Sequence, residues 1–141
     1  MNNPILAPAA VLVAWSLFML LWMAAVRFPA LAKVDLKGAD TRGGRGSDLE
    51  GILPREVQWK SHNYTHLMEQ PTLFYALVAI LALSGASELD SWLAWAYVVL
   101  RILHSLWQAI VNTIPVRFAL FLLSSTVLIV MAVRALLLTL G

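Results

Sequence analysis

The chain has 141 residues, of which 60% are hydrophobic, and its mean hydropathy is +0.77. This composition excludes an ordinary soluble domain and predicts an all-α integral membrane protein with one domain, residues 1–141. The formal net charge is only +2, and acidic residues are interleaved with the basic ones, so no nucleic-acid partner is expected. The absence of cysteine excludes disulfides, a cysteine nucleophile and thiolate metal sites.

The first apolar run predicts a membrane-spanning helix over about 5–27, which ends at Arg27. The run is longer than the core of a signal peptide and no basic residue precedes it, so we expect it to be retained. A polar loop, 28–61, follows. Its Gly43-Gly44-Arg45-Gly46 cluster lacks the flanking strand and helix of a phosphate-binding loop, so we interpret it as a flexible linker.

The second predicted helix covers about 62–84 and is apolar in its second half. Its first two turns carry polar residues that share one helical face or lie beside it: His62, Asn63, His66 and Glu69. Ionisable groups inside a membrane span are costly, so these residues are candidates for function. Pro71 removes a backbone hydrogen bond, which predicts a kink beside Glu69.

The third and fourth predicted helices cover about 92–111 and 115–140. The third carries its polar residues on one face: Arg101, His104 and Gln108. Since ionisable groups that face lipid are unfavourable, the polar faces of the second and third helices should turn towards each other. Arg117 lies in the first turn of the fourth helix, where a cation opposes the helix dipole but suits a bound anion. Arg134, near the far end, is interpreted as an interfacial anchor.

The distribution of Lys and Arg predicts the orientation of the chain in the membrane. It puts loop 28–61 and the 112–117 turn in the cytoplasm, with both termini and the 85–91 turn outside. Polar residues from four helices should then lie at one level near the inner leaflet: Arg27, His62, His66, Glu69, His104, Gln108 and Arg117.

Two chemistries fit this cluster. Three histidines and Glu69 could bind a metal, but Arg101 and Arg117 would repel a cation, so no metal site is predicted. The arginines could instead bind an anionic, partly zwitterionic ligand, which the charge balance favours. Two structural alternatives stay open: Glu69 and Arg101 could form an interhelical ion pair, and His104 could be a core histidine hydrogen-bonded across helices.

Four motifs stand in order along the chain: Val26-Arg27-Phe28, His66-Leu67-Met68-Glu69-Gln70-Pro71-x-x-Phe74, Arg101-x-x-His104 and Pro115-Val116-Arg117. In these residues the chain resembles the membrane-associated proteins in eicosanoid and glutathione metabolism, the MAPEG family. The resemblance implies a homotrimer of four-transmembrane-helix bundles, with glutathione bound between neighbouring subunits near the cytoplasmic face. It implies that Arg117 is catalytic and stabilises the glutathione thiolate. The residues expected to bind glutathione are Arg27, His62, Asn63, His66, Glu69, Arg101, His104 and Gln108.

The sequence also departs from the family pattern. His66 stands where the family usually has asparagine, and Phe118 and Phe121 stand where eicosanoid enzymes carry hydroxyl side chains. We predict a glutathione-dependent transferase or peroxidase that acts on lipophilic electrophiles in a bacterial inner membrane. The first alternative is a non-catalytic membrane protein of the same fold that binds a lipid or a partner, and the second is a metal-dependent membrane oxidoreductase.

Overall fold

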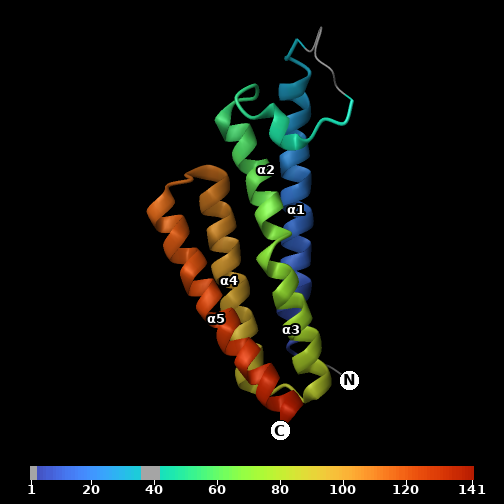
Figure 1. Ribbon diagram of the computed structural model, residues 1–141, viewed down its shortest axis with the longest axis vertical. Coiled ribbons are helices and arrows are strands. Elements are labelled where there is room, and N and C mark those ends of the chain that lie inside the picture. The colour runs from blue at the N-terminus through green and yellow to red at the C-terminus, as the bar shows by residue number, and fades with distance from the viewer. Residues whose placement is uncertain (1–2, 36–41) are drawn as a thin grey trace.

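A computed structural model describes residues 3–35 and 42–141. In chain order, these residues form α1 (Leu6–Leu31), the short 3-10 helix η1 (Gly46–Leu49), α2 (Arg55–Leu67), α3 (Gln70–Ser84), α4 (Glu88–Ile110) and α5 (Ile114–Leu140) (Figure 1). Because α2 and α3 follow each other along one span, four helical units are long and apolar enough to cross a membrane. The predicted all-α architecture with four spans is therefore confirmed.

The helices form an elongated bundle in which both termini lie at the same end as the turn between α3 and α4 (Figure 1). The α1–α2 connection and the α4–α5 turn lie towards the opposite end. Helix α4 contacts α1, α2 and α5, while α3 contacts α1 and α5. The polar first half of the second span, the end of α4 and the start of α5 are consequently at comparable depth.

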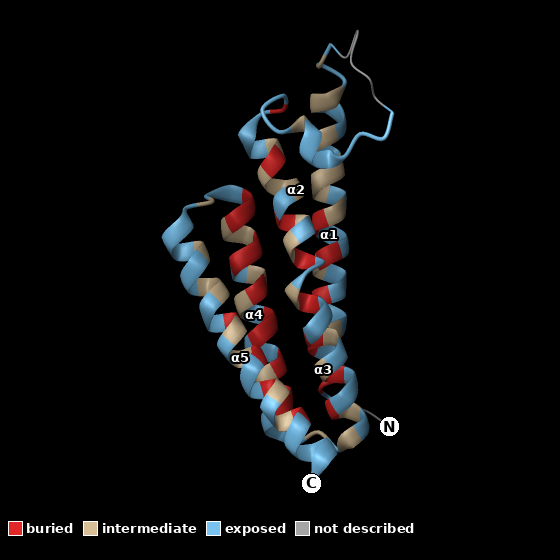
Figure 2. Ribbon diagram, in the orientation of Figure 1, coloured by how far each residue is buried: buried red, intermediate tan, exposed pale blue. Residues whose placement is uncertain are grey.

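Each long helix buries one face and leaves the rest apolar and exposed (Figure 2). On α5 the buried residues recur every three or four positions: Ser124, Leu128, Met131 and Ala135. The buried face of α4 is wider and includes Arg101, His104, Ser105 and Gln108. Large apolar side chains such as Leu83 and Leu137 are exposed at 89% and 69%, which suits contact with lipid.

The middle of the bundle is held by a stacked aromatic pair and a chain of hydrogen bonds. The rings of Phe74 and Tyr97 are both fully buried, with their centroids 4.5 Å apart and their planes at 19°. The Tyr97 hydroxyl donates to the side-chain oxygen of Gln70 at 3.2 Å, and the amide of Gln70 donates to Ser125 at 2.7 Å. These contacts join α3, α4 and α5.

The helices extend further into the predicted loop 28–61 than expected. Helix α1 continues to Leu31, and α2 begins at Arg55 directly after Pro54, so the second helix does not start at residue 62. The segment 55–61 is mostly polar, and a hydropathy profile does not reveal a polar helical segment that extends beyond the apolar layer of the membrane. Residues 36–41 of the predicted loop lie outside the described residues.

The predicted interruption beside Glu69 is present. Helix α2 ends at Leu67 and α3 begins at Gln70, with Pro71 in its first turn. Proline is tolerated in a first turn, where its missing N–H has no intrahelical partner in any case. The break leaves Glu69 between two helices, so it no longer has helical spacing from His62 and His66.

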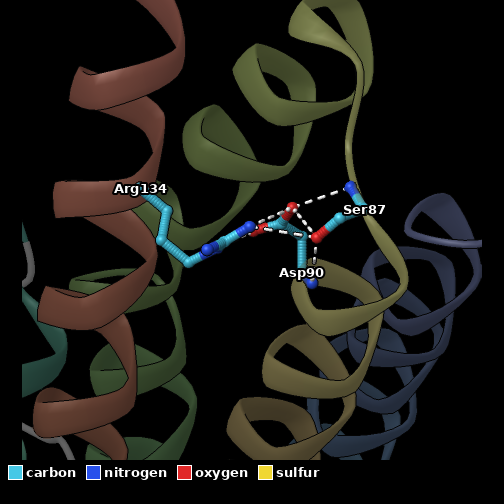
Figure 3. A network of polar contacts seen from close by, with 3 residues as sticks. All are labelled: Ser87, Asp90 and Arg134. Carbon is cyan, nitrogen blue, oxygen red and sulfur yellow. Dashed lines mark hydrogen bonds and ion pairs between the residues drawn. The ribbon is translucent and has the colours of Figure 1, made fainter.

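Arg134, interpreted from the sequence as an interfacial anchor, also pairs with side chains of another helix. Its guanidinium forms an ion pair with Asp90 and donates to the Ser87 hydroxyl at 3.0 Å (Figure 3). Ser87 and Asp90 also cap the start of α4, since the Asp90 carboxylate accepts from the Ser87 backbone N–H at 2.8 Å. Residues 44 positions apart in sequence thus join α4 and α5.

Candidate functional site

Arg117 lines three open cavities beside α2, α4 and α5. The loop cavity has a volume of about 1050 Å³ and is lined by residues 50–55, Gln58, Trp59, His62, Asn112, Ile114 and Arg117. The polar cavity, of about 550 Å³, is lined by residues 45–47, Glu50, Ser61, His62, Thr65, His66, Glu69, Gln108 and Arg117. The aromatic cavity, of about 200 Å³, is lined by His66, His104, Ile114, Arg117, Phe118 and Phe121.

The turn between α4 and α5 holds Arg117. Asn112 has a φ of +57°, a backbone conformation that asparagine adopts more easily than most residues. Its side-chain oxygen accepts a hydrogen bond of 2.6 Å from Arg117 Nη1. Sequence reasoning missed this contact, although an asparagine just before the proline-led helix was the available signal. The guanidinium and the first backbone N–H groups of α5 together favour a bound anion.

His66 on α2 and His104 on α4 stack on each other, with ring centroids 5.0 Å apart and planes at 21°. The ring of Phe121 approaches His66 edge-on at 5.8 Å. This cluster forms a wall of the aromatic cavity. The alternative of His104 as a core histidine hydrogen-bonded across helices differs from what the structure describes, where its cross-helix contact is the stacked imidazole of His66.

Arg101 is fully buried on α4 and contacts His66. Its Nη2 donates to Nδ1 of His66 at 3.1 Å and to the carbonyl oxygen of the same residue at 3.3 Å. Within the described chain, Nε and Nη1 of Arg101 have no hydrogen-bond partner. The alternative of a Glu69–Arg101 ion pair is wrong, because Arg101 contacts His66, whereas Glu69 is exposed in the break and lines the polar cavity.

The Ser105 hydroxyl joins three helices behind the cavities. It accepts from the amide of Asn63 at 2.8 Å and from the indole N–H of Trp15 at 2.9 Å. Asn63 is only 1% exposed, and its side-chain oxygen has no partner among the described residues. Asn63 therefore supports the cavity wall from behind, and no pattern in the sequence indicates the bonds to Ser105.

Arg27 and His62 hold the segment that covers the polar cavity. Arg27 donates to the Ser61 hydroxyl at 2.6 Å and to the carbonyl oxygen of Gly46 at 3.0 Å, so it ties η1 to α1 and α2. His62 Nε2 lies 2.8 Å from a carboxylate oxygen of Glu50, and both side chains are about half exposed. Arg27 lines none of the three cavities, whereas His62 lines two of them.

A family model described as the MAPEG family matches residues 5–137, nearly the whole chain. The chain belongs to the MAPEG family. The resemblance carried by the four motifs is thereby confirmed, and together with the four apolar spans it shows an integral, multi-pass membrane protein. No curated protein and no solved structure matches the chain significantly.

In this MAPEG protein the predicted site residues fall into three groups. His62, His66, Glu69, Gln108 and Arg117 line the polar cavity, and His104 joins His66 and Arg117 in the aromatic cavity. Asn63 and Arg101 are buried behind the cavities, and Arg27 holds the covering segment. The expected single pocket is thus divided into cavities that share Arg117.

The donor atoms for a metal are dispersed. Among residues 3–35 and 42–141, no group of three or more His, Asp or Glu side chains is arranged to hold a metal ion. His66 and His104 meet face to face, so their ring nitrogens do not converge on a point between them. The part of this MAPEG protein that the structure describes therefore offers no site for the metal-dependent alternative.

Proposed function

We propose that this MAPEG protein is a membrane-bound, glutathione-dependent transferase or peroxidase acting on lipophilic electrophiles, with Arg117 stabilising the glutathione thiolate. The observation that carries this proposal is the position of Arg117, which borders both a polar and an aromatic cavity. Glutathione has carboxylates, an ammonium group and a thiol, so it needs neighbours of both charges. The polar cavity supplies them from Arg45, Arg117, Glu50 and Glu69.

The aromatic cavity suits the second substrate. Its wall combines Arg117 with Ile114, Phe118 and Phe121, so an apolar electrophile would lie beside the thiolate. In a transferase reaction the thiolate sulfur forms a bond to the electrophilic carbon. The leaving group, for example chloride, departs with the electron pair of the broken bond.

The free energy that Arg117 must contribute to stabilise the glutathione thiolate is moderate. A free thiol has a pKa of about 8.5, and lowering it by two units requires roughly 2.7 kcal/mol. A unit charge at 4 Å supplies only about 1 kcal/mol in bulk water, but about 4 kcal/mol at an effective dielectric constant of about 20. A cavity partly shielded by the bundle is therefore sufficient, whereas a fully exposed arginine is not.

We also propose that the protein is a homotrimer in a bacterial inner membrane, with the 28–61 loop in the cytoplasm. The cavities are open on one side, which leaves room for a neighbouring subunit to close them, as the family resemblance implies. Crosslinking of the purified protein in detergent, resolved by mass, tests the trimer.

Conjugation of glutathione to a chlorinated nitrobenzene by the purified protein tests the function. We expect turnover by the wild type and a loss of about a hundredfold in Arg117→Ala, the scale typical of removing one preorganised charge-stabilising donor. Lys33→Ala is the matched control, because Lys33 is an exposed cation outside the three cavities. Absence of both turnover and a glutathione-induced thermal shift would favour the non-catalytic alternative.

A further inference from the structure

The contact between Arg101 and His66 determines which nitrogen of His66 carries a proton. A guanidinium can only donate hydrogen bonds. Since Arg101 Nη2 lies 3.1 Å from Nδ1 of His66, that nitrogen must be the unprotonated acceptor. The proton of the neutral imidazole is then on Nε2.

We infer that Arg101 is a positioning residue, which holds His66 in the Nε2–H tautomer so that His66 donates a hydrogen bond to the anion bound by Arg117. This inference rests on the proposed function and specifies what His66 does in it. His66 in this form is a fixed donor. It is not a general base, because Nε2 already carries its proton and Nδ1 is occupied by Arg101.

The surroundings of the two residues support this division of roles. His66 borders two of the three cavities that Arg117 lines, whereas Arg101 is 0% exposed and lines none of them. The hydrogen bond described for the His66 ring is at Nδ1, from Arg101. Among the residues that the structure describes, the two bonds to His66 are also the only hydrogen bonds that orient the buried guanidinium.

Ring packing fixes the direction of the imidazole as well as its tautomer. His104 covers one face of the His66 ring and Phe121 meets it edge-on. With one face packed and Nδ1 bonded, a half-turn flip of the ring would break the bond to Arg101, and any smaller rotation would also disturb the two ring contacts. The N–H of Nε2 is thereby preorganised, which reduces the entropic cost of binding an anion.

Nitrogen NMR of the histidine-labelled protein in nanodiscs tests the tautomer without any ligand. Spectra recorded at mildly alkaline pH, with signals assigned from His62→Gln and His104→Gln, should show an unprotonated Nδ1 and a protonated Nε2 for His66. Arg101→Lys retains a donor-only group and should preserve this signature, whereas Arg101→Met should give a mixture of tautomers. A protonated Nδ1 in the wild type, or an unchanged spectrum in Arg101→Met, would overturn the role of Arg101.

Calorimetric titration with glutathione tests the donor. His66→Leu should weaken binding by about tenfold to a hundredfold, the scale of one hydrogen bond to a charged group, while His66→Gln retains an N–H near Nε2 and should bind more tightly than His66→Leu. With S-methylglutathione, which has no thiolate, the penalty of His66→Leu should disappear. Equal glutathione affinity in the wild type and His66→Leu would refute the donor role and leave the proposed function standing. No binding by the wild type would refute the proposed function, and the spectrum alone would then decide whether Arg101 fixes His66.

Discussion

Ser105 offers the sharpest test of how the site is supported. Its hydroxyl oxygen has two lone pairs, and both are used by donors from other helices, Asn63 on α2 and Trp15 on α1. Ser105 is itself fully buried on α4. The substitution Ser105→Ala removes one atom and leaves two donors without their acceptor.

The expected cost follows from two estimates. In soluble proteins an unsatisfied buried donor costs about 1–3 kcal/mol. Interhelical hydrogen bonds in membrane proteins contribute less, about 0.6 kcal/mol on average and about 1.7 kcal/mol at most, because the unfolded chain in the membrane also finds partners. The membrane values apply to Ser105, so two lost bonds should destabilise the protein by about 1–3 kcal/mol.

Unfolding in mixed micelles that contain sodium dodecyl sulfate, followed by circular dichroism, measures this difference. The matched control is Ser124→Ala, because Ser124 is also fully buried but donates only to the carbonyl oxygen of Phe121 in its own helix, at 2.9 Å. The control should unfold close to the wild type, and Ser105→Thr should lose less than Ser105→Ala. Equal destabilisation in Ser105→Ala and Ser124→Ala would refute the three-helix junction.

Two further perturbations address the ends of the bundle. Arg134→Met should lower the melting temperature by several degrees because it leaves the Asp90 carboxylate without its cation, and Arg134→Lys should lower it less. Equal melting temperatures for the wild type and Arg134→Met would show that this ion pair does not stabilise the packing of α4 against α5. Arg27→Met should speed proteolysis near η1 without changing the helix content, since it removes the bonds to Gly46 and Ser61. Unchanged cleavage would show that other contacts hold this segment.

The four spans and their polar faces could be predicted from the sequence because both depend on local composition. Pro71 likewise revealed the break between α2 and α3, since a proline removes a backbone bond wherever it stands in a helix. The start of α2 at Arg55 could not be predicted in this way, because hydropathy detects the apolar part of a span and not a polar helical segment that extends beyond it.

The partners of individual side chains could not be predicted in the same way. Helical spacing predicted that Arg101 and Glu69 lie on polar faces that are turned towards each other. The break between α2 and α3 changes the direction of the Glu69 side chain, and Arg101 contacts His66 instead. Such pairing depends on the rotation of each helix about its axis, which no local pattern specifies. The ion pair between Asp90 and Arg134 could have been predicted from the depth of the two residues in the bundle, because both lie at the same end of adjacent helices.

Formation of the thiolate in the bound ligand tests the central claim most directly. Glutathione is added to the purified protein at neutral pH, and the ultraviolet absorbance of the thiolate is measured for wild type, Arg117→Gln and Lys33→Gln. We predict a saturable thiolate signal in the wild type and in Lys33→Gln, and its loss in Arg117→Gln. A wild type without a thiolate signal, or an Arg117→Gln variant with an undiminished one, would contradict the role of Arg117 as the anion-binding centre of these cavities.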